Sequence, residues 1–214
     1  MAAKTTTGVE ALYRASKSRV EIVDVPALGF VVVSGRGAPD GPAFAGAVQA
    51  LYTVSYGAHF LLRKEQGEAP RVMPLEGLWW LDDPDQQDIV TAVARGEATM
   101  ADTDRDAWRW QAMIMQPAPI DERTVVRAAQ QARKKNLEAL DELHFERWEE
   151  GRCAQILHVG AYSEEAPTIV RLHEGIAAAG YRPRGRHHEI YLGDPRRSAP
   201  EKLRTILRHP VEPH

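Results

Sequence analysis

The sequence predicts an α+β fold in which helices pack against one face of a β-sheet. Two observations predict it. Apolar stretches rich in Val, Ile and Phe, typical of strands, take turns along the chain with segments whose apolar residues recur every three or four positions, as in helices. The order strand, helix, strand, strand also occurs twice, over about residues 20–117 and 151–212, with an extra helix over about 121–143 between them. A duplicated architecture is therefore expected.

The first repeat begins with a predicted strand over 20–34, rich in β-branched residues. A Gly- and Pro-rich loop over 35–42 follows, because these residues favour turns. A helix is predicted over 43–64, where apolar and aromatic residues recur at spacings of three and four. Strands over 71–81 and 108–116 complete the repeat, and the second is apolar on both faces, which is typical of a central strand.

Two segments lie between the repeated elements. The acidic segment over 82–106 has no sustained periodicity and is predicted to be a loop, apart from a short helical turn at 89–94. The extra helix over 121–143 is predicted to begin at Asp121, whose carboxylate can accept a hydrogen bond from the first turn. Its apolar side is predicted to consist of Val126, Ala129, Leu137 and Leu140.

The second repeat follows Gly151. It consists of a predicted strand over 154–159 and a helix over 166–179, for which Ser163 is the expected N-cap. Strands over 186–192 and 205–211 then close the sheet.

The composition excludes several classes of partner. With 27 Lys and Arg against 30 Asp and Glu the formal net charge is −3, so no overall positive field is available to hold nucleic acid. The longest apolar stretches, such as 58–62, are far shorter than the roughly 20 residues that span a bilayer, and the N-terminus lacks the apolar core of a signal peptide. The single cysteine, Cys153, excludes an internal disulfide and suits a reducing compartment. We expect a cytoplasmic protein with no nucleic-acid and no membrane partner.

The strand over 186–192 carries the first candidate site. Side chains alternate along a strand, so His187, Glu189 and Tyr191 point to one face. If Ile190 packs under the helices, Glu189 lies on the helix-free face, where it can meet solvent or a ligand. Taken alone, such a glutamate is more often a solvated residue or the partner of an arginine.

Aromatic side chains supply the remaining candidates. Four of the five tryptophans fall on the two strands that flank the acidic segment. Tryptophan offers a large rigid apolar surface that suits stacking on a planar or cationic ligand, although core packing is its commoner role. Trp79 and Trp80 are neighbours on a strand and must face opposite sides, so only one of them can line a cleft. The candidate ligand-binding side chains are Trp79, Trp80, Trp110, Tyr52, Tyr56, His59, Tyr162 and His187.

No metal and no cofactor are predicted. His187 and His188 are adjacent and would point to opposite faces of a strand, and no HExxH motif or Cys/His cluster accompanies them. The pair Gly35 and Gly37 precedes a helix but lacks the third glycine of a dinucleotide-binding fingerprint.

Six segments, taken in order, match the pattern of a known family: Val-Glu-Ile-Val-Asp-Val-Pro (20–26), Val-Met-Pro-Leu-Glu-Gly-Leu-Trp-Trp (72–80), Trp-Arg-Trp-Gln-Ala-Met-Ile-Met-Gln-Pro (108–117), His-Val-Gly-Ala-Tyr-Ser-Glu-Glu-Ala-Pro-Thr-Ile (158–169), His-His-Glu-Ile-Tyr-Leu-Gly-Asp-Pro-Arg-Arg (187–197) and Ala-Pro-Glu-Lys-Leu-Arg-Thr (199–205). Nearly the whole chain thus resembles the GyrI-like small-molecule-binding family. The same fold is found as the drug-binding domain of multidrug-responsive transcription activators.

The resemblance implies a single domain over 1–214 with an antiparallel sheet. It implies that the two strand-helix-strand-strand repeats are related by pseudo-twofold symmetry, with a ligand groove between them on the sheet face opposite the helices. In the drug-binding relatives a glutamate of the penultimate strand meets cationic aromatic drugs, and Glu189 occupies the matching position. Because no DNA-binding domain precedes these segments, a transcription regulator is not expected.

The resemblance also implies a function. Some stand-alone members look like hydrolases that open the strained cyclopropane of DNA-alkylating natural products by adding water, with Glu189 and Tyr191 as the implied catalytic pair. A carboxylate can deprotonate water, and a phenol can donate to the oxygen that gains negative charge. The alternative is non-catalytic binding or sequestration of cationic or amphipathic drugs, and a gyrase-interacting inhibitor is a more distant one. The expected partner is a small molecule, and the expected state is a monomer or homodimer.

Overall fold

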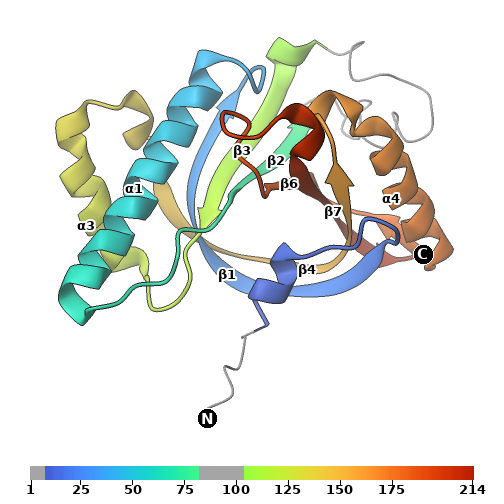
Figure 1. Ribbon diagram of the computed structural model, residues 1–214, viewed down its shortest axis with the longest axis horizontal. Helices are drawn as coiled ribbons and strands as arrows, with labels where there is room; N and C mark the ends of the chain where they lie inside the picture. The colour runs from blue at the N-terminus through green and yellow to red at the C-terminus, as the bar shows by residue number, and fades with distance from the viewer. Residues whose placement is uncertain (1–7, 82–103) are drawn as a thin grey trace.

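The computed structural model describes residues 8–81 and 104–214. Seven strands form an antiparallel sheet in the order β4-β1-β3-β2-β6-β7-β5, and an additional pairing joins β4 to β7. This pairing closes the sheet into a barrel, with three α-helices in the described part of the chain placed around it (Figure 1). In the same residues, no helix is both long and apolar enough to cross a membrane.

The predicted strands and helices occur in the predicted order along the chain, and one short strand, at Tyr181–Pro183, was not predicted. The strands are β1 (Glu21–Arg36), β2 (Leu75–Leu81), β3 (Trp108–Met115), β4 (His144–Val159), β5 (Tyr181–Pro183), β6 (His187–Tyr191) and β7 (Arg204–Pro213). The α-helices are α1 (Pro42–Gln66), α3 (Glu122–Ala132) and α4 (Ala166–Ala178). Short 3₁₀ turns are η1 (Glu10–Tyr13), η3 (Arg105–Ala107), η4 (Arg133–Lys135), η5 (Glu138–Leu140), η6 (Tyr162–Glu164) and η7 (Pro200–Lys202). The predicted loop over 82–106 lies outside the described residues as far as residue 103. The symmetry between the two repeats stays a prediction.

The helix predicted over 121–143 is much shorter. Asp121 caps it as expected, accepting a hydrogen bond from the Thr124 amide at 2.9 Å. The helix ends at Ala132, because two 3₁₀ turns follow and Asn136 between them adopts a left-handed conformation. The predicted apolar side was also wrong at Val126, which is 47% exposed, whereas its neighbour Val125 is buried.

Two predictions about the second repeat were also wrong. Strand β4 begins at His144, ten residues before the predicted start, because pairing with β1 holds a polar stretch in extended form. Ser163 does not cap α4: the N-cap is Glu165, and its side chain makes no capping hydrogen bond.

Closure of the sheet gives it an inner and an outer face, and this changes the predicted position of the groove. Helix α1 packs on β1 and β3, and α4 packs on β4 and β7. Glu189 and Tyr191 lie on this outer, helix-bearing side, while Ile190 is fully buried on the other face of β6. The prediction that Glu189 lies on a helix-free face was therefore wrong, because the face without helices is the filled interior of the barrel.

A polar network crosses the interior of the barrel. Both ring nitrogens of His188 face carboxylate oxygens, Nε2 at 3.0 Å from Glu76 Oε2 and Nδ1 at 3.0 Å from Glu150 Oε1. Arg208 donates to the second oxygen of Glu150 at 3.4 Å, and the Tyr13 hydroxyl donates to Glu76 at 2.6 Å. Two carboxylates thus face one guanidinium and one imidazole that can donate at both nitrogens, an arrangement that satisfies buried charges.

This network predicts that the protein loses stability at alkaline pH. Burial disfavours the charged imidazole, but Glu150 and Glu76 outweigh it and raise the pKa of His188 from 6.5 to about 9. A raised pKa in the folded state stabilises the protein fully below the unfolded value, and this contribution is lost as the pH rises through about 9. We expect the free energy of unfolding to fall by about 3 kcal/mol between about pH 6 and pH 9.5.

Urea titrations at the two pH values measure this fall, with a His188→Gln variant as the control that lacks the titrating group. An equal fall in the variant and the wild type would contradict the prediction.

Candidate functional site

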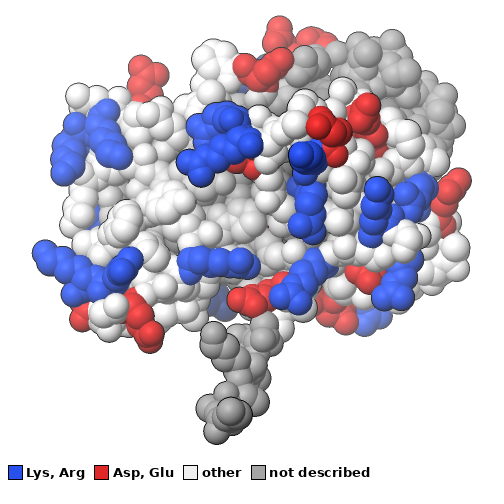
Figure 2. All heavy atoms as spheres, in the orientation of Figure 1, with Lys and Arg blue, Asp and Glu red and all other residues white. Residues whose placement is uncertain are grey.

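A cavity of about 2180 Å³ opens on the outer side of the barrel. Residues of α1, α3 and α4 form its walls, β2 and β6 form its floor, and the segment 192–197 lies at its edge. In Figure 1, α1 and α4 stand on either side of β2 and β6. On the face shown in Figure 2, uncharged side chains fill the centre, with Lys and Arg around them. The size suits a drug-sized or larger ligand.

The register between β2 and β6 positions the floor of the cavity. Trp79 pairs with His187, Gly77 pairs with Glu189, and both pairs are antiparallel. Directly paired residues of neighbouring strands share a face. This pairing therefore places an indole, an imidazole and a carboxyl group together, with Tyr191 two residues farther along β6.

A chain of hydrogen bonds connects these groups. The Trp79 indole Nε1–H donates to the Tyr191 hydroxyl at 3.0 Å, and this hydroxyl donates to Glu189 Oε2 at 2.8 Å. Gly77 makes room for the chain, since a Cβ at this position would lie 2.9 Å from the Trp79 nitrogen and 3.2 Å from the Tyr191 oxygen. The indole thus donates to the phenol, and the phenol donates to the carboxyl group of Glu189, where the chain ends.

Electrostatics keep the phenol protonated. Burial first, and then the charge and hydrogen bond of Glu189, raise the pKa of Tyr191 well above its usual value. Tyr191 therefore acts as a hydrogen-bond donor over the whole physiological pH range. This hydroxyl donates to Glu189, so the phenol orients the carboxyl group.

His187 lies beside Glu189 on the floor of the cavity. Its Nε2 is 3.4 Å from Glu189 Oε1 without the alignment of a hydrogen bond, and neither ring nitrogen has a hydrogen-bond partner within the described residues. The side chain is only 3% exposed. Buried polar groups are normally satisfied, so a polar group of a ligand is a suitable partner for this imidazole.

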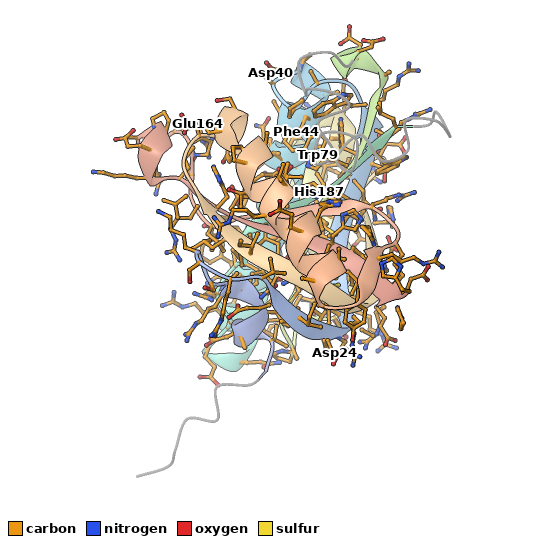
Figure 3. All side chains as sticks on the ribbon, turned by 90° about the vertical axis from the view of Figure 1, so that its right-hand side faces the viewer. Asp24, Asp40, Phe44, Trp79, Glu164 and His187 are labelled. Carbon is orange, nitrogen blue, oxygen red and sulfur yellow. The ribbon has the colours of Figure 1, made fainter. Side chains whose placement is uncertain are left out.

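Aromatic rings form the walls. The ring centroids of Phe44 and Trp79 are 5.2 Å apart, and Tyr162 meets Tyr191 edge to face at 5.6 Å. Figure 3 shows Phe44, Trp79 and His187 in succession along the site. Such surfaces suit a planar ligand, because stacked and edge-to-face contacts add to the burial of apolar area.

Most of the predicted site residues border this cavity. Those that line it are Tyr52, Tyr56, Trp79, Trp80, Tyr162, His187, Glu189 and Tyr191.

Both Trp79 and Trp80 border the cavity, contrary to the expectation that only one of them lines a cleft, but their partners differ. The Trp79 indole donates to Tyr191 on the floor. The ring of Trp80 stacks instead under the guanidinium of Arg186, 3.6 Å from its centroid.

Two predicted residues do not line the cavity. Trp110 is buried beneath Phe44, where Gly35 leaves space for its ring, since a Cβ at this glycine would lie 2.3 Å from the indole. His59 is held by its Nδ1, 2.8 Å from the carbonyl oxygen of Pro70. Both positions are explained by packing and local hydrogen bonding.

Sequence reasoning missed a second carboxyl group in the cavity. Glu165, the residue before α4, lines the cavity and is only 6% exposed, and its Oε1 has no hydrogen-bond partner in the described residues. Burial, followed by the negative charge of Glu189, raises the pKa of Glu165 well above its usual value. The signal for a helix N-terminus was present, with Pro167 in the first turn, but a residue at this position is normally expected to be solvated.

In the described residues, no group of three or more His, Cys, Asp or Glu side chains is arranged to hold a metal ion. Cys153 is buried, and burial strongly raises the pKa of its thiol, so it is not a reactive nucleophile.

A barrel with a large aromatic cavity, on whose floor the Tyr191 hydroxyl holds the carboxyl group of Glu189, defines a small-molecule-binding domain. The family is shown directly by residues 18–212, which match the GyrI-like small molecule binding domain. The chain belongs to this family. No curated protein matches the chain.

Solved structures agree with this assignment. An uncharacterized conserved protein from Listeria innocua is 34% identical, with a TM-score of 0.81 over 95% of this chain and 96% of that one. A hydrolase from Listeria innocua is also 34% identical, with a TM-score of 0.76 over 95% and 97% of the two chains. The C-terminal domain of EcmrR shares the fold, with a TM-score of 0.55 over 92% of this chain and 98% of that one, at 9% identity.

Proposed function

We propose that the cavity binds a planar aromatic or amphipathic compound and that Glu189 directs water onto an electrophilic carbon of this compound, opening a cyclopropane-type ring. The observation that carries the proposal is the hydrogen-bond chain from Trp79 through Tyr191 to Glu189 on the floor of an aromatic cavity. The 34% identity to a protein from Listeria innocua named a hydrolase supports the same class of reaction.

The roles follow from the geometry. The Tyr191 hydroxyl holds one oxygen of Glu189, and the other oxygen, 3.4 Å from His187 Nε2, orients and deprotonates a water molecule. The aromatic walls hold the planar substrate beside this water. The entropic cost of bringing the two reactants together is therefore met when the substrate binds, which lowers the barrier to the reaction. We further propose that the protein acts in the cytoplasm as a monomer or homodimer, without nucleic acid, since its net charge of −3 gives no overall attraction for a polyanion.

The test is the formation of a water adduct. The wild-type protein is incubated with a cyclopropane-containing alkylating compound, and mass spectrometry follows the gain of one water molecule. We expect the adduct to form much faster than in buffer alone, with multiple turnovers. Binding of the compound without adduct formation above the buffer rate would rule out the hydrolase.

The second candidate is a non-catalytic binder of cationic or amphipathic drugs. It is favoured by the carboxyl group of Glu189 within an aromatic cavity, because rings and a carboxylate together attract organic cations. Removal of the Glu189 charge distinguishes the two functions. It should lower the reaction rate of a hydrolase, whereas it should lower the affinity of a cation binder for its ligand.

A further inference from the structure

Glu165 and Glu189 enter the cavity from different elements. Glu165 comes from the N-terminus of α4 and Glu189 from β6, and both line the cavity. Their environments differ sharply. Glu189 accepts a hydrogen bond from Tyr191, whereas Oε1 of Glu165 is buried without a partner in the described residues. A carboxyl group that is buried without a partner favours its neutral, protonated form.

From this geometry we propose that Glu165 is the acid that complements Glu189: it carries a proton in the free protein and delivers it to the substrate oxygen that gains charge as the ring opens. This inference rests on the proposed function.

The groups around Glu165 support a neutral acid. Glu189 from β6 raises the pKa of Glu165, whereas the Thr205 hydroxyl from β7 lowers it, and burial is the largest effect. The phenols of Tyr162 and Tyr191 lie within its electrostatic reach, and no Lys or Arg of the described residues is among the groups that shift its pKa. Burial and the like charge of Glu189 both raise the pKa of Glu165.

The helix N-terminus acts in the opposite direction but is the smaller effect. A helix N-terminus attracts an adjacent carboxylate, but this attraction is smaller than the cost of burying an ionised carboxylate away from water. The side chain of Glu165 also makes no capping hydrogen bond to the amides of α4, which would be needed for the full effect of the helix. The protonated form therefore prevails.

The reaction balances with these two groups alone. Water gives one proton to Glu189 while its oxygen bonds to a cyclopropane carbon. The electron pair of the broken C–C bond moves through the conjugated system onto a carbonyl oxygen, which takes the proton of Glu165. Transfer of one proton from Glu189 back to Glu165 restores the resting state, and the net change is the addition of one water molecule. The step requires a substrate whose cyclopropane is conjugated to a carbonyl group.

The first test compares Glu165→Gln with wild type, using a spirocyclopropane cyclohexadienone as the probe and single-turnover formation of the water adduct as the readout. Glutamine keeps the size of a neutral acid but has no proton to give, so we expect the rate to fall by about 10²–10⁴-fold. The alkaline decline of the wild-type pH profile should disappear in the variant. Glu164→Gln is the matched control, because this neighbouring side chain is exposed and does not line the cavity, and its rate should equal that of wild type.

The second test does not depend on turnover. Infrared difference spectra of the free protein at neutral pH should contain the C=O stretch of a buried protonated carboxyl group, which disappears in Glu165→Gln and persists in Glu189→Gln. A wild-type spectrum without this signal, or a signal that persists in Glu165→Gln, would overturn the inference. Wild-type turnover that is unaffected by Glu165→Gln would also overturn it and leave the proposed function standing. If the wild-type protein forms no adduct, the proposed hydrolase function is wrong, and the proton transfer from Glu165 is wrong with it.

Discussion

Glu189→Gln is expected to lower the rate of water-adduct formation by about 10²–10⁴-fold, the usual contribution of a positioned general base. Glutamine keeps the shape of the side chain and can still accept a hydrogen bond from Tyr191, so the floor of the cavity should stay intact. What it loses is the ability to take a proton from water. Single-turnover kinetics at saturating protein isolate this step from substrate binding.

The same variant separates the two candidate functions when its affinity is also measured. A hydrolase should retain its affinity for a neutral planar compound, whereas a binder of cations should bind a lipophilic cation more weakly once the charge is removed. Glu201→Gln is a suitable control, because it makes the same change on the exposed η7 turn. Equal turnover in Glu189→Gln and wild type would exclude Glu189 from the mechanism.

Glu150→Gln is expected to destabilise the protein by about 3–5 kcal/mol, the usual cost of removing one partner from a buried ion pair. Glu150 contacts both Arg208 and His188 inside the barrel, and all three side chains are almost completely buried. The substitution leaves two cationic groups with the carboxylate of Glu76 alone. Urea denaturation at neutral pH measures the loss as a lower transition midpoint with an unchanged slope.

The control for this prediction is an ion pair on the outside of the same strand. Arg152 of β4 pairs with Asp24 at 3.0 Å, and both side chains are largely exposed. Exposed pairs contribute little to stability, so Arg152→Gln should leave the midpoint nearly unchanged. Similar effects of the buried and the exposed substitution would show that the interior network does not stabilise the barrel.

Local sequence patterns predicted most of the elements and part of the site. Apolar periodicity gave the order of strands and helices, because burial of one face requires it. Alternation along β6 correctly placed His187, Glu189 and Tyr191 on one face, and it required Trp79 and Trp80 to face opposite sides. Each of these conclusions depends only on the geometry of a single strand or helix.

Long-range pairing decided the rest. Alternation says which side chains share a face but not which face becomes the interior, and here the β4–β7 pairing closes the sheet and puts Glu189 on the helix-bearing side. The same closure buries His188 between Glu76 and Glu150, which come from two other strands. Glu165 reaches the cavity because α4 packs on β4 and β7, and other strands separate α4 from β7 in the sequence. The sequence by itself thus determined the residues that carry the site and their shared face, whereas their surroundings, and with them their charge states, depend on contacts between distant segments that no local pattern records.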